Sequence, residues 1–285
     1  AMRSSALRTA PDSAGRKVWP MSRDTMYGVV FLGDRVAEVR EFPIPHPGPG
    51  QVLIQMKRAA ICGSDLHVYR SPQSFFEGHE PWIPGHEPAG EVAELGAGCQ
   101  RLKVGERVSI YHYLACGHCR YCLAGYYQWC EQRRGLGQPN AVGPDADYMV
   151  VDERNCLPLP PELNYEDGAM IACIAATGFS SLRKLQLNGE DTLVVFGQGP
   201  VGLTGDIMGQ ALGARVIGVD LVPERLALAK KLGVKLVANP GACDLLATIR
   251  DLTGGRGADA AYETSGSAAG HQGVLDVLKD RKSVG

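Results

Sequence analysis

The stretch Val194–Gly202, VVFGQGPVG, decides the fold of the C-terminal half of this sequence. An apolar run leads into three glycines spaced G-x-G-x-x-G, at Gly197, Gly199 and Gly202, and a helix-like segment begins at Val201. In a dinucleotide-binding fingerprint the first glycine permits a tight turn, the second lets the backbone approach a pyrophosphate, and the third packs helix on strand. The helix start then offers free N–H groups to the phosphates. The spacing therefore predicts a dinucleotide site, with a simple glycine-rich turn as the alternative.

Strand-like and helix-like segments alternate around this fingerprint. The strand-like runs cover residues 191–197, 215–220, 234–239 and 258–266, and the helix-like runs cover residues 201–213, 222–233, 243–255 and 267–279. Such alternation predicts right-handed βαβ units in a doubly wound parallel sheet of the Rossmann type. A complete sheet of this kind has six strands. Because the sequence ends at Gly285, we expect a sheet truncated after about four strands, the fourth being an exposed edge.

An acidic residue lies where the ribose of a dinucleotide should be recognised. Asp220 ends the second strand-like run, about 20 residues after the fingerprint, where an acid usually binds the adenosine ribose hydroxyls. A carboxylate there repels a 2′-phosphate, so NAD is favoured over NADP. Arg225, on the following helix-like run, is placed to reach the adenosine end. The simpler alternatives are a helix-capping or turn role for Asp220 and a solvated helix face for Arg225.

The N-terminal half has a different pattern, made of short β-like runs between turn residues. These runs cover residues 26–32, 51–61, 89–95, 106–114 and 146–151. Their branched and aromatic residues, bounded by glycine and proline, predict a compact β-rich domain with long loops. Residues 1–25 are polar, arginine-rich and unpatterned, and we interpret them as a leader, a tag or a disordered segment.

Length and composition narrow the function classes. At 285 residues the chain is about two domains long, and its 45% hydrophobic and 21% charged residues are typical of a folded globular protein. Its 29 basic and 31 acidic residues are well mixed, which leaves no basic run for nucleic acid or a membrane surface. No apolar stretch approaches the ~18 residues of a membrane span. We therefore expect a cytoplasmic protein with a small-molecule partner, although the first 25 residues leave an organelle leader open.

Four of the nine cysteines lie within Cys116–Cys130, CGHCRYCLAGYYQWC. Disulfides are not favoured, because the sequence has no secretory signal and a reducing compartment keeps thiols free. The spacing C-x2-C-x2-C-x7-C lets the sulfurs converge, and four thiolates complete the tetrahedral coordination of zinc. No position then remains for water or substrate, so this zinc is structural. Its predicted ligands are Cys116, Cys119, Cys122 and Cys130. An iron–sulfur cluster is the weaker alternative, since neither a second cluster motif nor a following proline is present.

A catalytic metal needs an open coordination position and hence three protein ligands. Candidate donors are scattered: Cys62 in ICGSDLH, His86 with Glu87 in GHEPAG, and Cys173 in MIACIAATG. Each is ambiguous by itself, because a lone cysteine usually fills space in a core. His112 is a histidine without an evident purpose. Spacing alone does not select among these residues.

Together the motifs resemble the medium-chain, zinc-containing alcohol dehydrogenase family, from about residue 26 to the end. The resemblance lies in ICGSDLH, GHEPAGEV, KVGERV, the four-cysteine segment, CIAATG, and GQGPVG followed by Asp220, in the family's order and at similar intervals. It implies a GroES-like catalytic domain over residues 26–172, with a structural zinc lobe at 116–130. An NAD-binding Rossmann domain would then occupy residues 173–285.

The resemblance also implies how the scattered donors act. Cys62, His86 and Cys173 are expected to bind the catalytic zinc, with Glu87 as a nearby acid that approaches the metal. Such an ion is a Lewis acid that lowers the pKa of an alcohol, and the coenzyme accepts a hydride from the alcohol. Two metal sites and NAD are therefore the expected cofactors.

Three further residues receive roles from the resemblance. Ser64 and His67 match the family's proton relay from the substrate hydroxyl to solvent, for which an imidazole with an unperturbed pKa of ~6.5 is suited. Their alternatives are a turn hydroxyl and a surface helix residue. Asp65 is expected to orient the loop or a ligand histidine.

Two motifs indicate different classes of substrate. CIAATG keeps the interval of simple alcohol dehydrogenases, whereas CGSDLHVYR is closer to polyol and threonine dehydrogenases. We interpret the chain as an NAD-dependent zinc enzyme that converts an alcohol or polyol to an aldehyde or ketone, in an architecture that forms homodimers or homotetramers. The alternatives are a catalytically impaired fragment that still binds zinc, and a zinc-keeping reductase of quinones or enals.

Overall fold

The computed structural model describes residues 10–11, 17–18, 24–78, 83–138 and 142–284. Contacts within the chain divide it into two compact units, residues 1–172 and 173–285. Most of the segment interpreted as a leader, tag or disordered region lies outside the described residues. Within it, β1 (Ala10–Pro11) pairs with β2 (Lys17–Val18) in an antiparallel arrangement.

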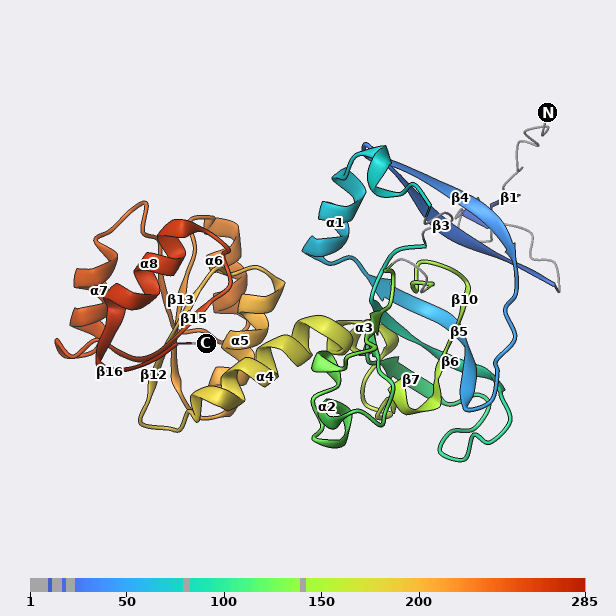
Figure 1. The fold of residues 1–285 in the computed structure, drawn as a ribbon. Coiled ribbons are helices and arrows are strands. Elements are labelled where there is room, and N and C mark those ends of the chain that lie inside the picture. Colours follow the sequence, from blue (N-terminus) through green and yellow to red (C-terminus); the bar gives the residue numbers. More distant parts are fainter. Residues whose placement is uncertain (1–9, 12–16, 19–23, 79–82, 139–141, 285) are drawn as a thin grey trace. The chain divides into compact units, whose positions relative to one another are not determined.

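The first unit is built around an antiparallel sheet of five strands in the order β10-β5-β6-β7-β11 (Figure 1). The strands are β5 (Gln51–Ala60), β6 (Glu87–Leu95), β7 (Arg107–Ile110), β10 (Tyr148–Asp152) and β11 (Cys156–Pro158). Alternate residues face one core, because successive side chains of a strand point to opposite faces. That core contains Val52, Ile54, Val92, Val108, Ile110, Met149 and Val151. The β-rich first domain predicted from the sequence is confirmed.

A hairpin of β3 (Thr25–Gly33) and β4 (Val36–Pro43) precedes this sheet. Its two turn residues, Asp34 and Arg35, both have positive φ angles of 49° and 65°. Two consecutive residues of this kind form the tight turn whose twist suits a hairpin. The sequence does not predict β4, because most of its residues are exposed and show no apolar alternation.

Loops between the strands of the first unit carry short elements. They are α1 (Gly63–Arg70), η1 (Gln73–Phe75), β8 (Tyr113–Leu114), α2 (Arg120–Leu123), η2 (Tyr127–Trp129), β9 (Arg134–Gly135) and η3 (Glu153–Asn155). The strands β8 and β9 pair with each other and enclose the cysteine-rich lobe between them. The loop after β5 leads directly into α1, with Cys62 as the residue before the helix.

No pattern in the sequence predicts the helical stretch from residue 165 to residue 185. It consists of α3 (Tyr165–Met170), a π-helical turn (Ile171–Ala175) and α4 (Ala176–Leu185). The start of α3 is capped reciprocally: the Asp167 N–H donates to the Asn164 side chain at 2.8 Å, and the Asn164 N–H donates to Asp167 at 2.9 Å. Turns of π-helix are frequent at functional sites, and Cys173 is the middle residue of this one.

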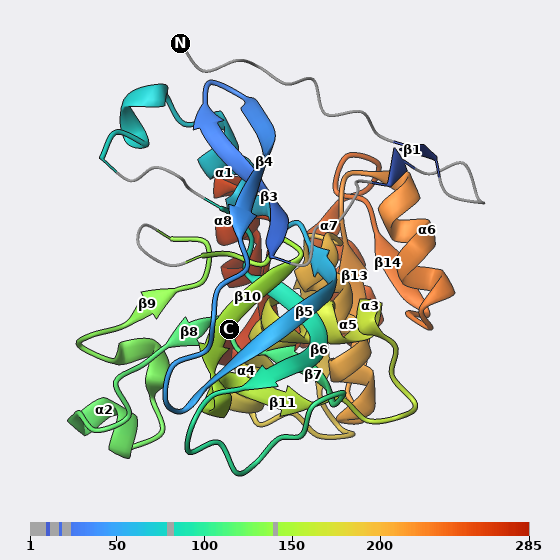
Figure 2. The same ribbon diagram turned by 90° about the vertical axis from the view of Figure 1, so that its right-hand side faces the viewer.

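The second unit is a parallel sheet of five strands in the order β14-β13-β12-β15-β16, covered by helices (Figures 1 and 2). The strands are β12 (Thr192–Phe196), β13 (Arg215–Val219), β14 (Leu236–Ala238), β15 (Ala258–Glu263) and β16 (Leu278–Val284). The helices between them are α5 (Pro200–Ala211), α6 (Pro223–Lys231), α7 (Leu245–Leu252) and α8 (Ala268–Val277). This arrangement confirms the predicted doubly wound parallel sheet.

The central strand β12 is buried along its whole length, as expected for a strand covered on both faces. Val194 and Phe196 belong to a core that also contains residues of α7 and α8. Leu193 and Val195 belong to a second core, which contains residues of α4, α5 and α6. The two cores therefore lie on opposite faces of one sheet.

The expectation that the sheet stops after four strands is wrong. Strand β16 pairs in parallel with β15, which is therefore hydrogen-bonded on both sides. Helix α8 ends at Val277, and the chain turns directly into β16. The polar sequence KDRKSVG gives no strand signal, but charged residues are typical of strands at the edge of a sheet.

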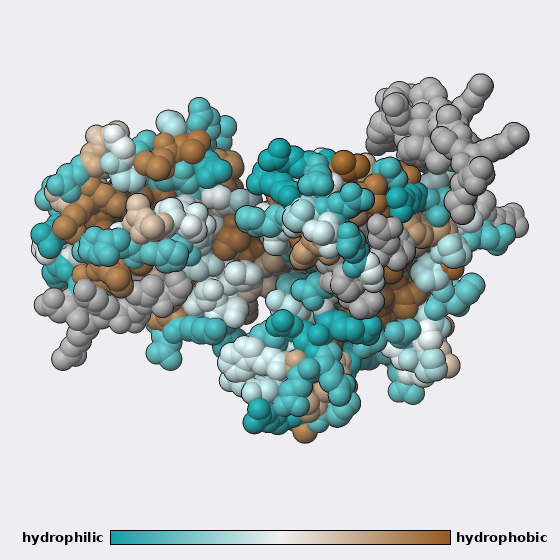
Figure 3. Space-filling model, turned by 45° about the horizontal axis from the view of Figure 1, so that its top comes forward, coloured by the Kyte–Doolittle hydropathy of each residue, from teal (hydrophilic) through white to brown (hydrophobic). Residues whose placement is uncertain are grey.

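Hydrophobic residues also reach the surface of the second unit, in separate patches among hydrophilic residues (Figure 3). Exposed examples are Ile207, Leu221, Leu228 and Leu275. Within the described parts of the chain, no helix combines the length and the apolarity that crossing a membrane requires.

Candidate metal and coenzyme sites

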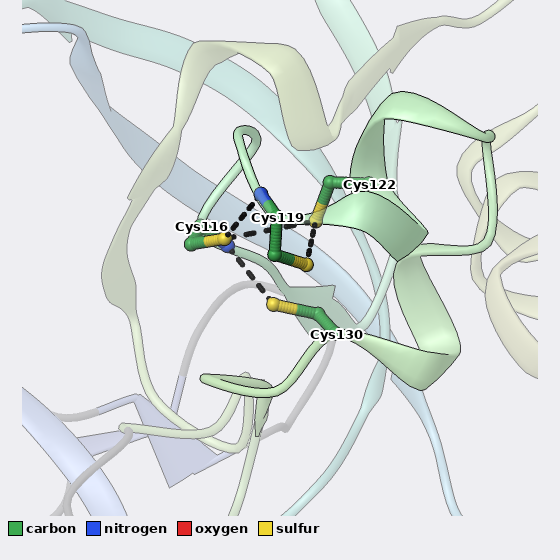
Figure 4. A group of neighbouring side chains, drawn as sticks. All are labelled: Cys116, Cys119, Cys122 and Cys130. Carbon is green, nitrogen blue, oxygen red and sulfur yellow. Dashed lines mark hydrogen bonds between the residues drawn. The ribbon is translucent and has the colours of Figure 1, made fainter.

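The four cysteines of the lobe point toward one centre (Figure 4). Their sulfur atoms all lie within 4.8 Å of one another. The sulfur of Cys122 is 3.8 Å from that of Cys116 and 3.5 Å from that of Cys119. A tetrahedron with zinc–sulfur bonds of about 2.3 Å has edges of about 3.8 Å. The four residues therefore fit a zinc ion with all four coordination positions filled by protein.

Backbone N–H groups around this cluster favour thiolates. The N–H groups of Cys116 and Gln132 each donate to the Cys130 sulfur at 3.3 Å, and the Cys119 N–H donates to Cys116 at 3.3 Å. Backbone N–H groups of Cys122 and Glu131 lower the pKa of Cys119 to about 6, and the Cys116 N–H lowers the pKa of Cys130. Burial instead raises the pKa of Cys122 to about 12, so its charge depends on the ion.

A second group of donors contains Cys62, His86, Glu87 and Cys173. One ligand atom from each of these residues lies within 4.8 Å of the others, although the residues are up to 111 positions apart in the sequence. Cys62 precedes α1, His86 precedes β6, Glu87 is the first residue of β6, and Cys173 is in the π-helical turn. Two sulfurs, one imidazole and a completely buried carboxyl group match the donor chemistry of a catalytic zinc with an open position. The structure thus brings together the four residues that sequence spacing alone could not select.

Asp65 links two of these donors. One of its carboxylate oxygens accepts the Cys62 N–H at 2.7 Å, and the other is 3.0 Å from Nδ1 of His86. Because a carboxylate only accepts, Nδ1 carries the hydrogen and Nε2 is left as the ligand atom. Burial lowers the pKa of His86, but Asp65 and Cys62 outweigh this effect and raise the pKa to about 10. A metal ion that binds at this cluster therefore has to displace a proton from His86.

His112, which has no motif of its own in the sequence, lies beside this donor group. Its ring is 5.6 Å from the His86 ring, in an edge-to-face arrangement, and its Nδ1 is 2.9 Å from the Ala172 carbonyl oxygen. Burial lowers the pKa of His112, and the nearby His86 lowers it further. Only the fold brings the segment between β7 and β8 to this position, so no sequence signal could have identified His112.

Ser64 and His67 lie three residues apart on α1, and both are exposed. Residues with this spacing share one face of a helix. Within the described residues, neither side chain makes a hydrogen bond. The proton relay expected from the family resemblance therefore stays a prediction.

Two of the three fingerprint glycines in the second unit are sterically required. Gly197 has a φ of 88°, and a Cβ at Gly202 would lie 1.8 Å from the Gly197 carbonyl oxygen. Gly199 is the residue before α5, and a Cβ there would meet open space. The backbone at Gly199 is thus accessible to a ligand, next to the N–H groups at the start of a helix of 12 residues. Val201 packs against the core with its side chain, so only its backbone faces this ligand position.

Asp220 stands at the end of β13, next to the same loop. Its carboxylate accepts the Gln198 N–H at 2.7 Å and the Val222 N–H at 2.8 Å. Arg225 lies 3.6 Å from the same carboxylate. Asp220 therefore shapes the turn, one of the two roles considered for it, and its recognition of a ribose stays a prediction. Thr264, which the sequence did not single out, adds to this edge by donating to the Phe196 and Gly197 carbonyl oxygens at 2.9 Å.

Comparison with known proteins identifies the family of this chain. Residues 48–161 match the alcohol dehydrogenase GroES-like domain, and residues 200–284 match the zinc-binding dehydrogenase family. The chain is 38% identical to the uncharacterized zinc-type alcohol dehydrogenase-like protein YphC of Escherichia coli, over 90% of this chain and 75% of that protein. It is 37% identical to an L-threonine 3-dehydrogenase of Mesorhizobium japonicum, over 85% of this chain and 70% of the other.

A solved structure of a related enzyme has the same fold as this chain. The crystal structure of 2R,3R-butanediol dehydrogenase from Bacillus subtilis superimposes with a TM-score of 0.81 at 32% identity, covering 91% of this chain and 76% of that one. The chain therefore belongs to the medium-chain, zinc-containing alcohol dehydrogenase family, as its motifs predicted.

Proposed function

We propose that this chain is an NAD-dependent zinc alcohol dehydrogenase that oxidises an alcohol or polyol to an aldehyde or ketone. The observation that carries the proposal is the convergence of Cys62, His86, Glu87 and Cys173, whose ligand atoms lie within 4.8 Å of one another. The relatives named above oxidise hydroxyl groups according to their names, which supports the same reaction class.

Cys62, His86 and Cys173 would hold a zinc ion, which would act as a Lewis acid and lower the pKa of the substrate hydroxyl. Glu87, fully buried next to these ligands, is the nearby acid that the family resemblance expects to approach the metal. Asp65 fixes the His86 ring through Nδ1 and ties it to the Cys62 backbone, so both donors keep one geometry.

The second unit provides the place for the hydride acceptor. The backbone around Gly199 and Val201 receives the pyrophosphate, with Gly197 and Gly202 permitting the tight turn. Asp220 selects the unphosphorylated ribose of NAD, and Arg225 lies at the adenosine end of the site.

The hydroxyl proton leaves by way of the exposed face of α1. Ser64 is suited to pass it and His67 to release it to solvent, because an imidazole exchanges protons near neutral pH. A cytoplasmic location is favoured by the six cysteine ligands of the two groups, since a reducing compartment keeps thiols free. Assembly into a homo-oligomer is proposed on the family resemblance.

The purified chain tests this function directly. We expect two zinc ions per chain, saturable NAD binding, and NADH formation with members of an alcohol and polyol panel. Cys173→Ser should keep one zinc and lose turnover by at least about 1000-fold, as expected when a catalytic Lewis acid is removed. Cys243→Ser is the matched control, because Cys243 is an exposed cysteine outside both clusters, and it should keep both zinc ions. Absence of saturable NAD binding would defeat the proposal.

A further inference from the structure

Two buried polar side chains lie next to each other beneath the fingerprint loop. Gln198 in the loop is 1% exposed, and Asp206 on α5 has no exposed surface. The amide nitrogen Nε2 of Gln198 donates to the Val195 carbonyl oxygen at 3.2 Å, which leaves the amide oxygen Oε1 for a second partner. No described residue donates a hydrogen bond to this Oε1 or to either carboxyl oxygen of Asp206. Three acceptor atoms are therefore buried together without a donor.

Close packing holds the two side chains in place. A Cβ at Gly218 on β13 would lie 3.0 Å from the side chain of Gln198, which therefore fills the space above this glycine. A Cβ at Gly205, the neighbour of Asp206 on α5, would lie 2.8 Å from the Tyr262 ring on β15. Helix α5 thus approaches the sheet closely on both sides of the pair. A proton on Asp206 supplies the missing donor, because a neutral carboxyl group donates one hydrogen bond and Oε1 of Gln198 accepts it.

Charged groups do not take the place of that proton. Burial raises the pKa of Asp206 to about 7 and Gln198 opposes this effect, whereas no charged residue of the described chain contributes. Tyr262 faces α5, but burial raises its pKa further above neutrality, so it stays uncharged. The other titratable groups on the elements that pack against α5 are Arg183 and Lys184 on α4, Arg215 on β13, Asp220 after β13, and Asp259 and Glu263 on β15.

We propose that Asp206 is a positioning residue for the coenzyme loop: its carboxyl proton donates to Oε1 of Gln198 and holds the loop in the form that binds NAD. This inference rests on the proposed function, in which the loop receives the pyrophosphate. Gln198 lies between the fingerprint residues Gly197 and Gly199, and its backbone N–H donates to Asp220 at 2.7 Å. A shift of Gln198 therefore affects both the pyrophosphate position and the residue expected at the ribose.

Ionisation of Asp206 reverses the polarity of the pair. A carboxylate only accepts, so Nε2 of Gln198 turns toward Asp206 and leaves the Val195 carbonyl oxygen. The proton thus favours the form of the loop that binds NAD, and bound NAD favours the proton to the same extent. Since the pKa of Asp206 is raised to about 7, the affinity for NAD is complete at acidic pH and falls as the pH rises through this value.

The test measures the Kd of ADP-ribose, which has the pyrophosphate and both riboses of NAD but no nicotinamide. Calorimetry on the zinc-loaded protein between pH 6 and pH 9 should show a rise of about 10-fold in the wild-type Kd, the effect of one buried hydrogen bond. Asp206→Asn donates to Oε1 at every pH and should keep the tight Kd at pH 9. Asp206→Leu fills the space without a donor and should bind about 10-fold more weakly at every pH. Asp251→Asn, at an exposed position on α7, should follow wild type.

Dividing the Kd of each variant by that of wild type removes any pH dependence that arises elsewhere in the protein. A ratio for Asp206→Asn that stays constant from pH 6 to pH 9 would overturn the assignment, and so would equal affinities of the Asn and Leu variants. If one variant fails to fold, the other still decides, because each is expected to lose the pH dependence. If ADP-ribose binds as expected but no alcohol yields NADH, the proposed function fails and the role of Asp206 stands. If ADP-ribose does not bind at any pH, the assignment fails.

Discussion

Asp206 provides a test of the packing in the second unit, because it is a carboxylic acid buried against the sheet without a partner. It lies on α5 with no exposed surface, and neither carboxylate oxygen has a hydrogen-bond partner within the described residues. The side-chain oxygen of Gln198, in the fingerprint loop, is also buried and unpartnered. No hydrogen bond of normal geometry from a described residue reaches Asp206, but the Gln198 side chain lies close enough to act on it: burial raises the pKa of Asp206 from 3.8 to about 7, and Gln198 offsets only part of this effect. The folded protein therefore holds Asp206 as a neutral acid over much of the range below neutrality.

The sign of the pH dependence follows from the raised pKa. Since the folded state binds this proton more tightly than the unfolded state, the stabilising contribution is complete below pH 3.8 and is lost as the pH rises to about 7. The difference corresponds to about 4 kcal/mol in total at 1.36 kcal/mol for each tenfold change. Between pH 5 and pH 8 about 3 kcal/mol of this is expected to disappear, which is a change of about 100-fold in the opening equilibrium.

The test substitution is Asp206→Asn, which keeps the size and shape of the side chain but replaces the titratable carboxyl group with an amide. Its amide donates to Gln198 at every pH, so the variant should lack this part of the pH dependence. Hydrogen exchange of the β12 amides, followed by mass spectrometry at pH 5 and pH 8, reports opening of the second unit. Intrinsic amide exchange depends on pH equally in both proteins, so dividing the wild-type exchange rate by the variant rate removes it. This ratio should be about 100-fold higher at pH 8 than at pH 5.

The matched control is Asp251→Asn, which makes the same change at an exposed position on α7. Its exchange-rate ratio to wild type should stay constant between pH 5 and pH 8. An equally constant ratio for Asp206→Asn would refute the reasoning, because it would mean that the buried acid is ionised in the folded state without cost.

Further changes test the other sites. Asp65→Asn should weaken zinc at the catalytic group about 10- to 100-fold in chelator competition, because it removes the charge that orients a ligand histidine, and unchanged affinity would contradict this role. Cys119→Ser should reduce the zinc content from two ions to one and alter the fluorescence of Trp129, which stacks on a tyrosine in the same lobe, whereas two retained ions would refute a four-cysteine site. Asp220→Ser should lower kcat/KM for NAD about 10- to 100-fold and improve NADP, since Arg225 is then free to bind a 2′-phosphate, and an unaltered coenzyme preference would exclude Asp220 from recognition.

Sequence patterns alone predict a site when all of its residues lie in one short segment. The spacing of Cys116 to Cys130 places four sulfurs in one short segment, so no long-range folding is needed to predict their convergence. The fingerprint from Gly197 to Gly202 is likewise contained in one turn between a strand and a helix. Apolar runs in the second unit predicted the parallel sheet, because buried strands such as β12 are continuously hydrophobic.

Features that depend on tertiary structure could not be predicted in the same way. Cys62 and Cys173 come from segments that only the fold brings together, and without the family resemblance their spacing selected neither. The sequence gives His112 no role, because a single histidine between two tyrosines forms no motif. The charged sequence of β16 does not predict a strand, because its pairing with the backbone of β15, and not an apolar pattern of its own, makes it one. Asp206 is an acidic residue within the largely apolar sequence of α5, and only the folded structure shows that its side chain is fully buried.

Anomalous diffraction at the zinc absorption edge, from crystals of the zinc-loaded protein, tests the central claim most directly. We predict two peaks in each chain, one enclosed by the four cysteines of the lobe and one bound by Cys62, His86 and Cys173. A single peak in the lobe, with nothing between those three side chains, would contradict the account.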